Sequence, residues 1–341
     1  MSSDPSTGPD AKPAFRSGFV ALCGRPNVGK STLLNALLGE QLAIATSLPQ
    51  TTRERMLGIW TSDRFQAVLV DTPGIHRAKS ALNKFMVEEA LRGASGVDVI
   101  LMLAEVPALH RREGSLDAAV AEWEPGPGAV EAAELLAGLG KPMVLVLTKA
   151  DLLGDRRLLL PIIDKWQAIQ KFAAVVPVSA LRNKGLEGLR AELEALLPEG
   201  PPLYDQEQLS DRSTRWHAAE LIRAELFERL GQELPYSCAV TIAEYKELRE
   251  RDRIEADIHV ERDSQKGIVI GAKGRTIKAI SMAARERIEA LTGRPCELFL
   301  EVRVTPRWTR DPSKLAELGY RVEASGPEEP QDREPSDEVL P

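Results

Sequence analysis

The feature that most constrains this chain of 341 residues is one eight-residue stretch, Gly24-Arg25-Pro26-Asn27-Val28-Gly29-Lys30-Ser31. It follows the apolar run 19–23 and precedes a helical pattern at 31–38. Glycines at this spacing let the backbone fold back so that its N–H groups point at phosphate oxygens, and the helix adds its N-terminal dipole. We therefore predict a nucleotide phosphate site, in which Lys30 reaches the β- and γ-phosphates and Ser31 ligates Mg²⁺.

Four further apolar runs, at 65–70, 97–103, 143–147 and 173–178, alternate with amphipathic stretches. Continuous β-branched runs separated by helices indicate a parallel sheet covered on both faces. We predict that residues 16–198 form an α/β P-loop domain with a doubly wound, mainly parallel sheet, whose ligands bind beyond the carboxyl ends of the strands. The Pro- and Gly-rich segment at about 105–130 is interpreted as a surface excursion rather than core.

Pro198–Pro202 breaks the preceding helix, and residues 199–212 are interpreted as a linker. Beyond it we expect a helix at about 213–230, strands near 237–245 and 254–262, a glycine turn, a helix at about 275–291 and a strand at 296–304. This pattern predicts a smaller α+β domain over residues 213–310. Residues 1–15, and the acidic tail that follows a C-terminal helix within 311–341, are expected to be disordered.

A second motif, Asp71-Thr72-Pro73-Gly74, comes directly after the run at 65–70. An Asp at a strand end can hold a Mg²⁺-bound water, and the N–H of Gly74 can meet the γ-phosphate. In the polar loop 49–53, a threonine can ligate Mg²⁺ when the γ-phosphate is present, which makes the loop a switch. We favour Thr52 over Thr51, and a capping pair is the alternative. The predicted metal ligands are Ser31, Thr52 and Asp71, and the predicted catalytic residues are Lys30, Thr52 and Gly74.

The base is read by two further motifs, Thr148-Lys149-Ala150-Asp151 and Ser179-Ala180, each at the end of an apolar run. A carboxylate at Asp151 can accept hydrogen bonds from the N1–H and exocyclic amine of guanine, which adenine does not offer. The backbone N–H groups of Ser179 and Ala180 suit the O6 carbonyl. The predicted nucleotide is therefore GTP or GDP.

Together these motifs resemble the translation-factor-type GTPases over residues 18–197. Thr148 stands where that family usually carries Asn, so the amide contact to the base edge is expected to be lost. Ile75 stands where Ras-like enzymes carry a glutamine, and isoleucine cannot orient the attacking water, so slow intrinsic hydrolysis is expected. Asn27 resembles the asparagine of GTPases that use K⁺, which makes K⁺ stimulation a hypothesis. His76 is assigned no catalytic role.

In the second domain, Gly271-Ala272-Lys273-Gly274 stands between an apolar stretch and a helix, as in the loop with which KH modules clamp a single-stranded backbone.

The whole chain has 44 basic and 51 acidic residues, a net charge of −7, which alone argues against a nucleic-acid partner. Residues 262–287, however, hold seven basic and two acidic residues, whereas the tail 321–341 holds two and seven. The predicted RNA contacts are Gly271, Ala272, Lys273, Gly274, Arg275 and Lys278. Trp308 is either a stacking platform or a packing residue.

With these features, residues outside the tails and the 105–130 segment resemble the Era family of bacterial ribosome-assembly GTPases, which joins one P-loop GTPase domain to one KH (type II) domain. The resemblance implies binding near the 3′ end of 16S rRNA, a role in 30S subunit assembly and a loose association with the inner membrane surface. The three cysteines are too few for a disulfide framework, so we expect a cytoplasmic protein. We also expect a monomer. The alternative is a signalling GTPase whose C-terminal module binds a protein.

Overall fold

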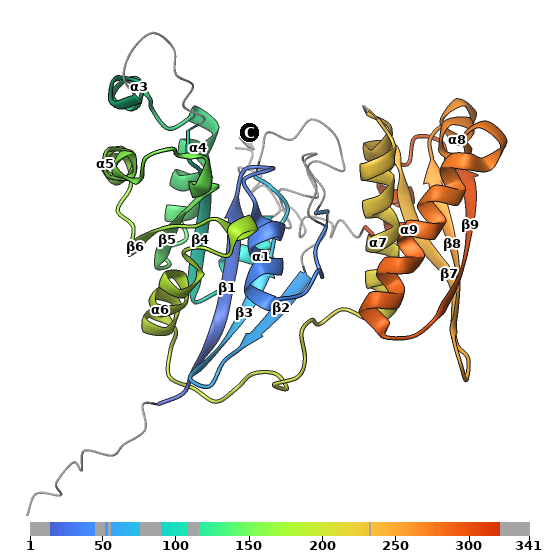
Figure 1. The fold of residues 1–341 in the computed structure, drawn as a ribbon, viewed down its shortest axis with the longest axis horizontal. Coiled ribbons are helices and arrows are strands. Elements are labelled where there is room, and N and C mark those ends of the chain that lie inside the picture. The colour runs from blue at the N-terminus through green and yellow to red at the C-terminus, as the bar shows by residue number, and fades with distance from the viewer. Residues whose placement is uncertain are drawn as a thin grey trace, which may run out of the picture.

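The computed structural model describes residues 14–44, 52–53, 56–75, 90–107, 116–231 and 233–320. The tails at 1–13 and 321–341 and the middle of the 105–130 segment lie outside these ranges. Figure 1 shows a larger body built on a six-stranded sheet and a smaller body built on three strands, with the linker running between them. The predicted fold class, a P-loop α/β domain followed by a smaller α+β domain, is confirmed.

The six-stranded sheet has the strand order β2-β3-β1-β4-β5-β6. Its strands are β1 (Arg16–Gly24), β2 (Met56–Thr61), β3 (Phe65–Asp71), β4 (Val99–Glu105), β5 (Met143–Thr148) and β6 (Ala174–Pro177). The five strands predicted from apolar runs are parallel, whereas β2 was not predicted and pairs antiparallel with β3 at the edge. β2 carries apolar side chains, but its burial is mixed: Met56, Gly58 and Ile59 are buried, whereas Leu57, Trp60 and Thr61 are partly exposed, as expected at a sheet edge.

Helices cover both faces of this sheet. Successive side chains of β1 point to opposite faces: Val20 and Leu22 pack with α1 (Lys30–Leu38) and α6 (Leu186–Leu196), and Ala21 and Cys23 pack with α4 (Pro127–Ala137) and α5 (Leu159–Ile169). All four side chains are fully buried. The central strand is therefore fixed on both sides, which holds the loop that leaves its carboxyl end.

The 105–130 segment is not simply a surface excursion, which corrects the prediction. It contributes α3 (Leu116–Glu122) and the start of α4, and Val106 and Val120 are 3% and 1% exposed in the core. Pro127 lies in the first turn of α4, a place where its missing N–H is not needed. Here proline begins a helix instead of marking a loop.

The second body holds a three-stranded sheet in the order β7-β8-β9, with β7 antiparallel and β9 parallel to β8. Its elements are α7 (Thr214–Arg229), β7 (Ala239–Glu247), β8 (Asp252–Val260), α8 (Asp263–Ile270), α9 (Arg275–Thr292), β9 (Cys296–Val304) and α10 (Pro312–Glu317). Helix α8 was not predicted, since its apolar end was read only as a stretch before the glycine turn. Ile222, Ile258 and Ile280 from α7, β8 and α9 meet in its core, each fully buried.

The linker is bonded along the first body. The N–H of Gly200 donates to the Phe15 carbonyl at 3.0 Å, and the Ile59 N–H of β2 donates to the Leu209 carbonyl at 2.9 Å. Farther on, Asp211 Oδ1 accepts from the Leu57 N–H at 2.9 Å. The segment just before α7 therefore runs beside the edge strand. In the described part of the chain, no helix is both long and apolar enough to span a membrane.

Candidate nucleotide site and nucleic-acid interface

The loop between β1 and α1 has a backbone that mainly glycine allows. Gly24, Asn27 and Gly29 have φ of 144°, 64° and 96°, and a Cβ added at Gly24 would lie 2.5 Å from the Leu103 carbonyl oxygen. The close approach of β4 therefore requires glycine at the first position of the motif. The chain turns tightly here and enters α1 at Lys30.

Lys30 lies inside the curve of this loop. Its side chain is nearly fully buried, and Nζ donates to the carbonyl oxygens of Arg25 at 3.0 Å and Gly24 at 3.4 Å. Burial lowers the pKa of Lys30, and the nearby Asp71 carboxylate opposes that shift. An ammonium held at this point can meet the phosphates of a nucleotide bound on the loop.

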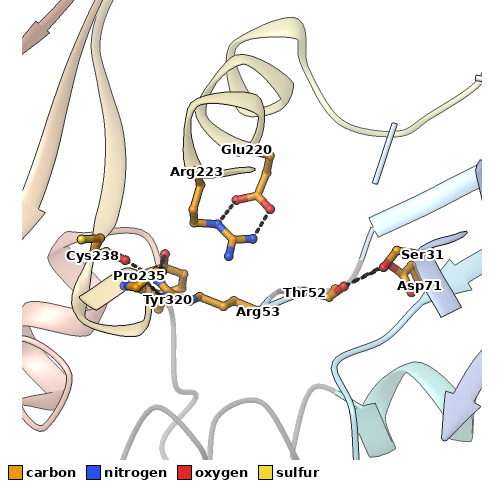
Figure 2. A network of polar contacts seen from close by, with 9 residues as sticks. All are labelled: Ser31, Thr52, Arg53, Asp71, Glu220, Arg223, Pro235, Cys238 and Tyr320. Carbon is orange, nitrogen blue, oxygen red and sulfur yellow. Dashed lines mark hydrogen bonds and ion pairs between the residues drawn. The ribbon is translucent and has the colours of Figure 1, made fainter. Parts of the chain in front are cut away.

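The three predicted metal ligands lie together at the ends of α1 and β3. Asp71 Oδ2 accepts from the Ser31 hydroxyl at 3.1 Å and from the Thr52 hydroxyl at 3.2 Å, and those two hydroxyl oxygens are 3.1 Å apart (Figure 2). Asp71 is 1% exposed, and its Oδ1 is buried without a hydrogen-bond partner among the described residues. Burial raises the pKa of Asp71 to about 6. Two hydroxyls and a buried carboxylate are oxygen ligands that suit Mg²⁺. Thr51 lies outside the described residues.

The segment after β3 is locked against the phosphate loop. Thr72 Oγ1 donates to the Leu22 carbonyl at 2.7 Å, and the Ile75 N–H donates to the Gly24 carbonyl at 3.0 Å. A Cβ added at Gly74 would lie 2.7 Å from Pro26, so glycine is required where Pro73-Gly74 passes the loop. The Ile75 side chain is 8% exposed and packs in the core. His76 lies outside the described residues.

A cavity of about 130 Å³ lies where the base motifs converge. It is lined by Gly29, Thr32, Leu33, Thr148, Lys149, Asp151, Leu152, Val178, Ala180 and Leu181. Leu152 and Leu181 are 61% and 81% exposed and supply apolar surface that the sequence reasoning missed. Lys149 has a left-handed backbone and an ion pair with Glu105, Nζ to Oε2 at 2.5 Å. Motifs that are about 30 residues apart in sequence thus line one pocket.

Thr148 binds the phosphate loop through its hydroxyl. Oγ1 donates to the Val28 carbonyl at 2.6 Å, with the Ala104 carbonyl at 3.3 Å, and Thr148 is 5% exposed. The hydroxyl therefore connects the end of β5 to the phosphate loop.

At the second base motif the structure corrects the prediction for one of the two amides. The Ser179 N–H already donates to the Lys184 carbonyl at 2.9 Å within a tight loop. No acceptor for the Ala180 N–H is seen among the described residues, so this amide is the one available to a base carbonyl. Ser179 Oγ is buried and likewise has no partner in the described part of the chain.

The Gly271-Ala272-Lys273-Gly274 loop joins α8 to α9. Gly271, Lys273 and Gly274 have φ of 72°, 53° and 73°, and Gly274 caps the N-terminus of α9. The side chains of Lys273, Arg275 and Lys278 are exposed. No carboxylate of the described residues lies within 4.0 Å of these three cations, whereas Arg303 pairs with Asp257 and Glu301. The free positive charge therefore gathers at the glycine loop and the helix N-terminus, where backbone N–H groups face outward.

Trp308 is a packing residue, so its role as a stacking platform is wrong. It is fully buried, its Nε1 donates to the Ser237 carbonyl at 2.9 Å, and its ring stacks on Tyr320. The sequence reasoning also missed Arg53, which is 3% exposed and bonds to the second body. An arginine flanked by polar residues in the sequence gives no local indication that its side chain is buried.

Comparisons with known proteins agree with this two-part arrangement. A family model described as 50S ribosome-binding GTPase matches residues 19–149, and a KH domain model matches residues 233–309. The chain is 45% identical over 308 residues to GTPase Era of Geotalea uraniireducens, covering 90% of this chain and 98% of that protein. It is 40% identical over 307 residues to GTPase Era of Lactobacillus helveticus, covering 90% and 96%.

Two solved structures are similar over the same length. One is a crystal structure of Era in complex with MgGDPNP and nucleotides 1506–1542 of 16S ribosomal RNA, with a TM-score of 0.83, 34% identity and coverage of 90% of this chain and all of that one. The other is a variant of Aquifex aeolicus Era bound to GDP and AlF4⁻, with a TM-score of 0.82, 35% identity and the same coverage. Since both domains, their order and nearly the full length of these relatives are matched, the chain belongs to the Era family of GTPases.

Proposed function

We propose that this GTPase is a nucleotide-dependent switch that binds 16S rRNA near its 3′ end through the Gly271–Gly274 loop and assists 30S subunit assembly. The observation that carries the proposal is the loop itself, at the N-terminus of α9, with exposed cations that form no ion pair with a carboxylate of the described residues. A related Era structure holds a 16S rRNA fragment and a GTP analogue together. Phosphate approaches a main chain only where side chains leave room, which the two glycines provide.

In the first domain, the phosphates bind Gly24, Arg25, Pro26, Asn27, Val28, Gly29 and Lys30, with Thr72, Pro73, Gly74 and Ile75 closing the γ-phosphate side. Ser31, Thr52 and Asp71 hold Mg²⁺, which supplies charge stabilisation at the β- and γ-phosphates when bound. The unpartnered Oδ1 of Asp71 supports this assignment. Guanine enters the 130 Å³ cavity, which Lys149 and Asp151 line on one side and Ala180 on the other. Ala150 and Ser179, the remaining residues of the two base motifs, are neighbours of these lining residues in sequence.

The test replaces the two central loop residues and keeps both glycines. In Ala272→Asp with Lys273→Asp, both positions are exposed, and an aspartate tolerates the left-handed φ of 53° at Lys273. The matched control, Ala243→Asp with Lys246→Asp, makes the same changes at exposed positions of β7, across the sheet from β9. Affinity is measured by fluorescence anisotropy with a single-stranded 16S 3′-end oligonucleotide, with a GTP analogue and with GDP.

We expect the loop variant to lose at least about tenfold in affinity and to have a shallower salt dependence, since each lost phosphate contact changes the slope of log K against log salt by about 0.7. The control should bind as the native chain does. Equal binding by the loop variant and the control would rule out the loop as the RNA clamp. If the native chain itself fails to bind the oligonucleotide, the alternative of a protein-binding module is favoured.

K⁺ stimulation belongs to the same proposal. Ile75 is buried and offers no polar atom for water, and Asn27 has a left-handed backbone at the exposed turn of the phosphate loop. A monovalent cation held beside that turn supplies the positive charge that an arginine finger supplies elsewhere. GTP hydrolysis should be several-fold faster in KCl than in NaCl, and equal rates in the two salts would refute K⁺ stimulation. We further propose that the protein is a cytoplasmic monomer with peripheral membrane contact.

A further inference from the structure

Arg53, the residue next to Thr52, belongs to the first domain but is satisfied by the second. Its guanidinium donates to the carbonyl oxygens of Cys238 at 2.8 Å and Pro235 at 3.4 Å and to the Tyr320 hydroxyl at 3.1 Å, three residues that Figure 2 shows around it. It also donates to the Tyr236 carbonyl at 3.1 Å. The residue is 3% exposed. All these partners lie more than 180 residues away in sequence, so the contact joins the two domains.

Aromatic rings form the walls of the Arg53 pocket. The guanidinium carbon lies 5.4 Å from the Trp308 ring centroid and 5.7 Å from that of Tyr320, and the two rings stack on each other. No carboxylate in the described part of the chain pairs with Arg53. Its charge is held by carbonyl dipoles and ring faces, a geometry that fits a planar guanidinium and not a lysine ammonium.

This pocket requires the chain beyond the KH match. Tyr320 follows α10, and its N–H donates to the Leu315 carbonyl at 2.8 Å. Leu315, Trp308 and Tyr320 form a small buried cluster with Ala239 of β7. The C-terminal helix thus brings Tyr320 back onto the second domain, where its hydroxyl closes the pocket.

Thr52 lies one residue before Arg53, and the two side chains reach opposite sites. Thr52 bonds at 3.1 Å and 3.2 Å to Ser31 and Asp71 in the first domain. Figure 2 shows Arg53 pointing the other way, with the ion pair of α7 between buried Arg223 and half-buried Glu220 above this short segment. Consecutive Cα atoms are 3.8 Å apart, so docking of Arg53 restricts where the Thr52 hydroxyl can be.

We infer that Arg53 is a positioning residue for the magnesium-bound GTP state, which it serves by anchoring Thr52 to the pocket of the second domain. The inference rests on the proposed role of Ser31, Thr52 and Asp71 as the Mg²⁺ ligands. GDP lacks the γ-phosphate that calls for the Thr52 ligand, so the anchor favours GTP over GDP. Coupling of this kind is reciprocal, so bound GTP stabilises the docked arrangement of the two domains by the same factor.

The test measures equilibrium affinities of the full chain for a fluorescent GTP analogue and for GDP, together with the Mg²⁺ concentration at half-saturation. Arg53→Ala should weaken analogue binding by about 5- to 150-fold, the range of allosteric couplings, and leave GDP binding unchanged. Tyr320→Phe, which keeps the ring, should show a smaller loss of the same kind. The matched control is Arg215→Ala, since Arg215 also donates to backbone carbonyls, those of Ile242 and Ala243, but within the second domain alone.

A double-mutant cycle separates this inference from the site assignment. Thr52→Val should lose the same preference for the analogue, and adding Arg53→Ala to it should cost little more, because both act through one hydroxyl. If Thr52→Val has no effect, the assignment of Thr52 to Mg²⁺ fails. If Arg53→Ala costs as much in the Thr52→Val background as in the native chain, the anchor is refuted while the metal site stands.

A second readout does not depend on nucleotide affinity. Spin labels at Glu131→Cys on α4 and Glu286→Cys on α9 occupy exposed positions, while the three native cysteines are buried. At saturating analogue, the native chain should give a narrower interdomain distance distribution than with GDP, and Arg53→Ala should abolish that difference. A distribution that narrows equally in Arg53→Ala would overturn the inference.

Discussion

Thr148 offers the sharpest test of how this GTPase holds its nucleotide. The family's usual asparagine would reach the base edge, but the Thr148 hydroxyl instead donates to the Val28 carbonyl at 2.6 Å. Replacing Thr148 with valine keeps the shape and removes the donor. Both Thr148 and Val28 are buried, so water cannot easily take its place.

The magnitude follows from what the carbonyl loses. A net hydrogen bond contributes about 1 kcal/mol, and leaving a buried acceptor unsatisfied raises the cost to about 3 kcal/mol. Without this hydrogen bond the phosphate loop can adopt conformations that do not bind nucleotide. The apparent affinity is then the intrinsic affinity multiplied by the fraction of molecules whose loop can still bind. The expected loss is therefore between about fivefold and 150-fold, at 1.4 kcal/mol for each factor of ten. GTP and GDP should be affected equally, because the loop contacts both.

The assay is equilibrium binding of fluorescent GDP and GTP analogue to the full chain, with urea unfolding in parallel. Thr148→Ser is the matched control, since it keeps the hydroxyl and loses only a methyl group. Its affinity for GDP and for the GTP analogue should lie within about twofold of the native chain, a much smaller change than the tenfold that corresponds to 1.4 kcal/mol. Native affinity for GDP in Thr148→Val would refute the reasoning, and a loss confined to the GTP analogue would assign Thr148 to the switch instead.

Three further outcomes are expected. Asp151→Asn should shift preference from GTP toward xanthosine triphosphate in a competition assay, because an amide cannot accept both guanine donors. Gly271→Ala should destabilise the second domain to urea by about 1–3 kcal/mol, because Gly271 has φ 72° and ψ 170°, a combination that is essentially open to glycine alone. Its added Cβ would also lie 2.1 Å from Thr276 Oγ1. Gly267→Ala, inside α8 with nothing within 4 Å, should instead stabilise the domain. Burial lowers the pKa of His217 below 6.5, so the native chain binds fewer protons than the unfolded chain there. Stability should therefore fall as pH drops through 6.5, and His217→Asn should flatten that slope.

The phosphate and metal motifs could be placed from sequence because their signals are local. A glycine at a forced φ, a lysine at a helix start and an Asp at a strand end lie within a few residues of the element that positions each. The partners of Thr148 and Arg53 lie 120 and more than 180 residues away, and no local pattern reports them. The sequence predicted where these motifs lie, but it did not predict the long-range hydrogen bonds that Thr148 and Arg53 make.

Two elements of the second domain escaped for a different reason. Ile268, Val269 and Ile270 have strand-forming side chains, yet they end a helix in which only Val269 is buried. The Gln265 side chain accepts a hydrogen bond from the Arg262 N–H at 3.0 Å and so caps the N-terminus of α8. This cap stabilises the helix although its last residues prefer strands. Trp308 stands between Arg307 and Thr309-Arg310, a polar sequence context that is the same whether its ring faces solvent or the core. Only the return of the chain after α10 buries it.

The switch segment is held by the rest of the chain at both of its ends. Arg53 bonds to the second domain, and four residues later the Leu57 N–H of β2 bonds to Asp211, two residues before Ser213 caps α7. This part of the first domain is therefore attached at two points, to the second domain through Arg53 and to the linker just before α7 through the Leu57–Asp211 hydrogen bond. Two attachments restrict the orientation of the second domain relative to the first. A single attachment would let the second domain rotate about that one contact. If the proposed Mg²⁺ and RNA sites are correct, this geometry links the Thr52 hydroxyl to the domain whose Gly271–Gly274 loop lies at the N-terminus of α9.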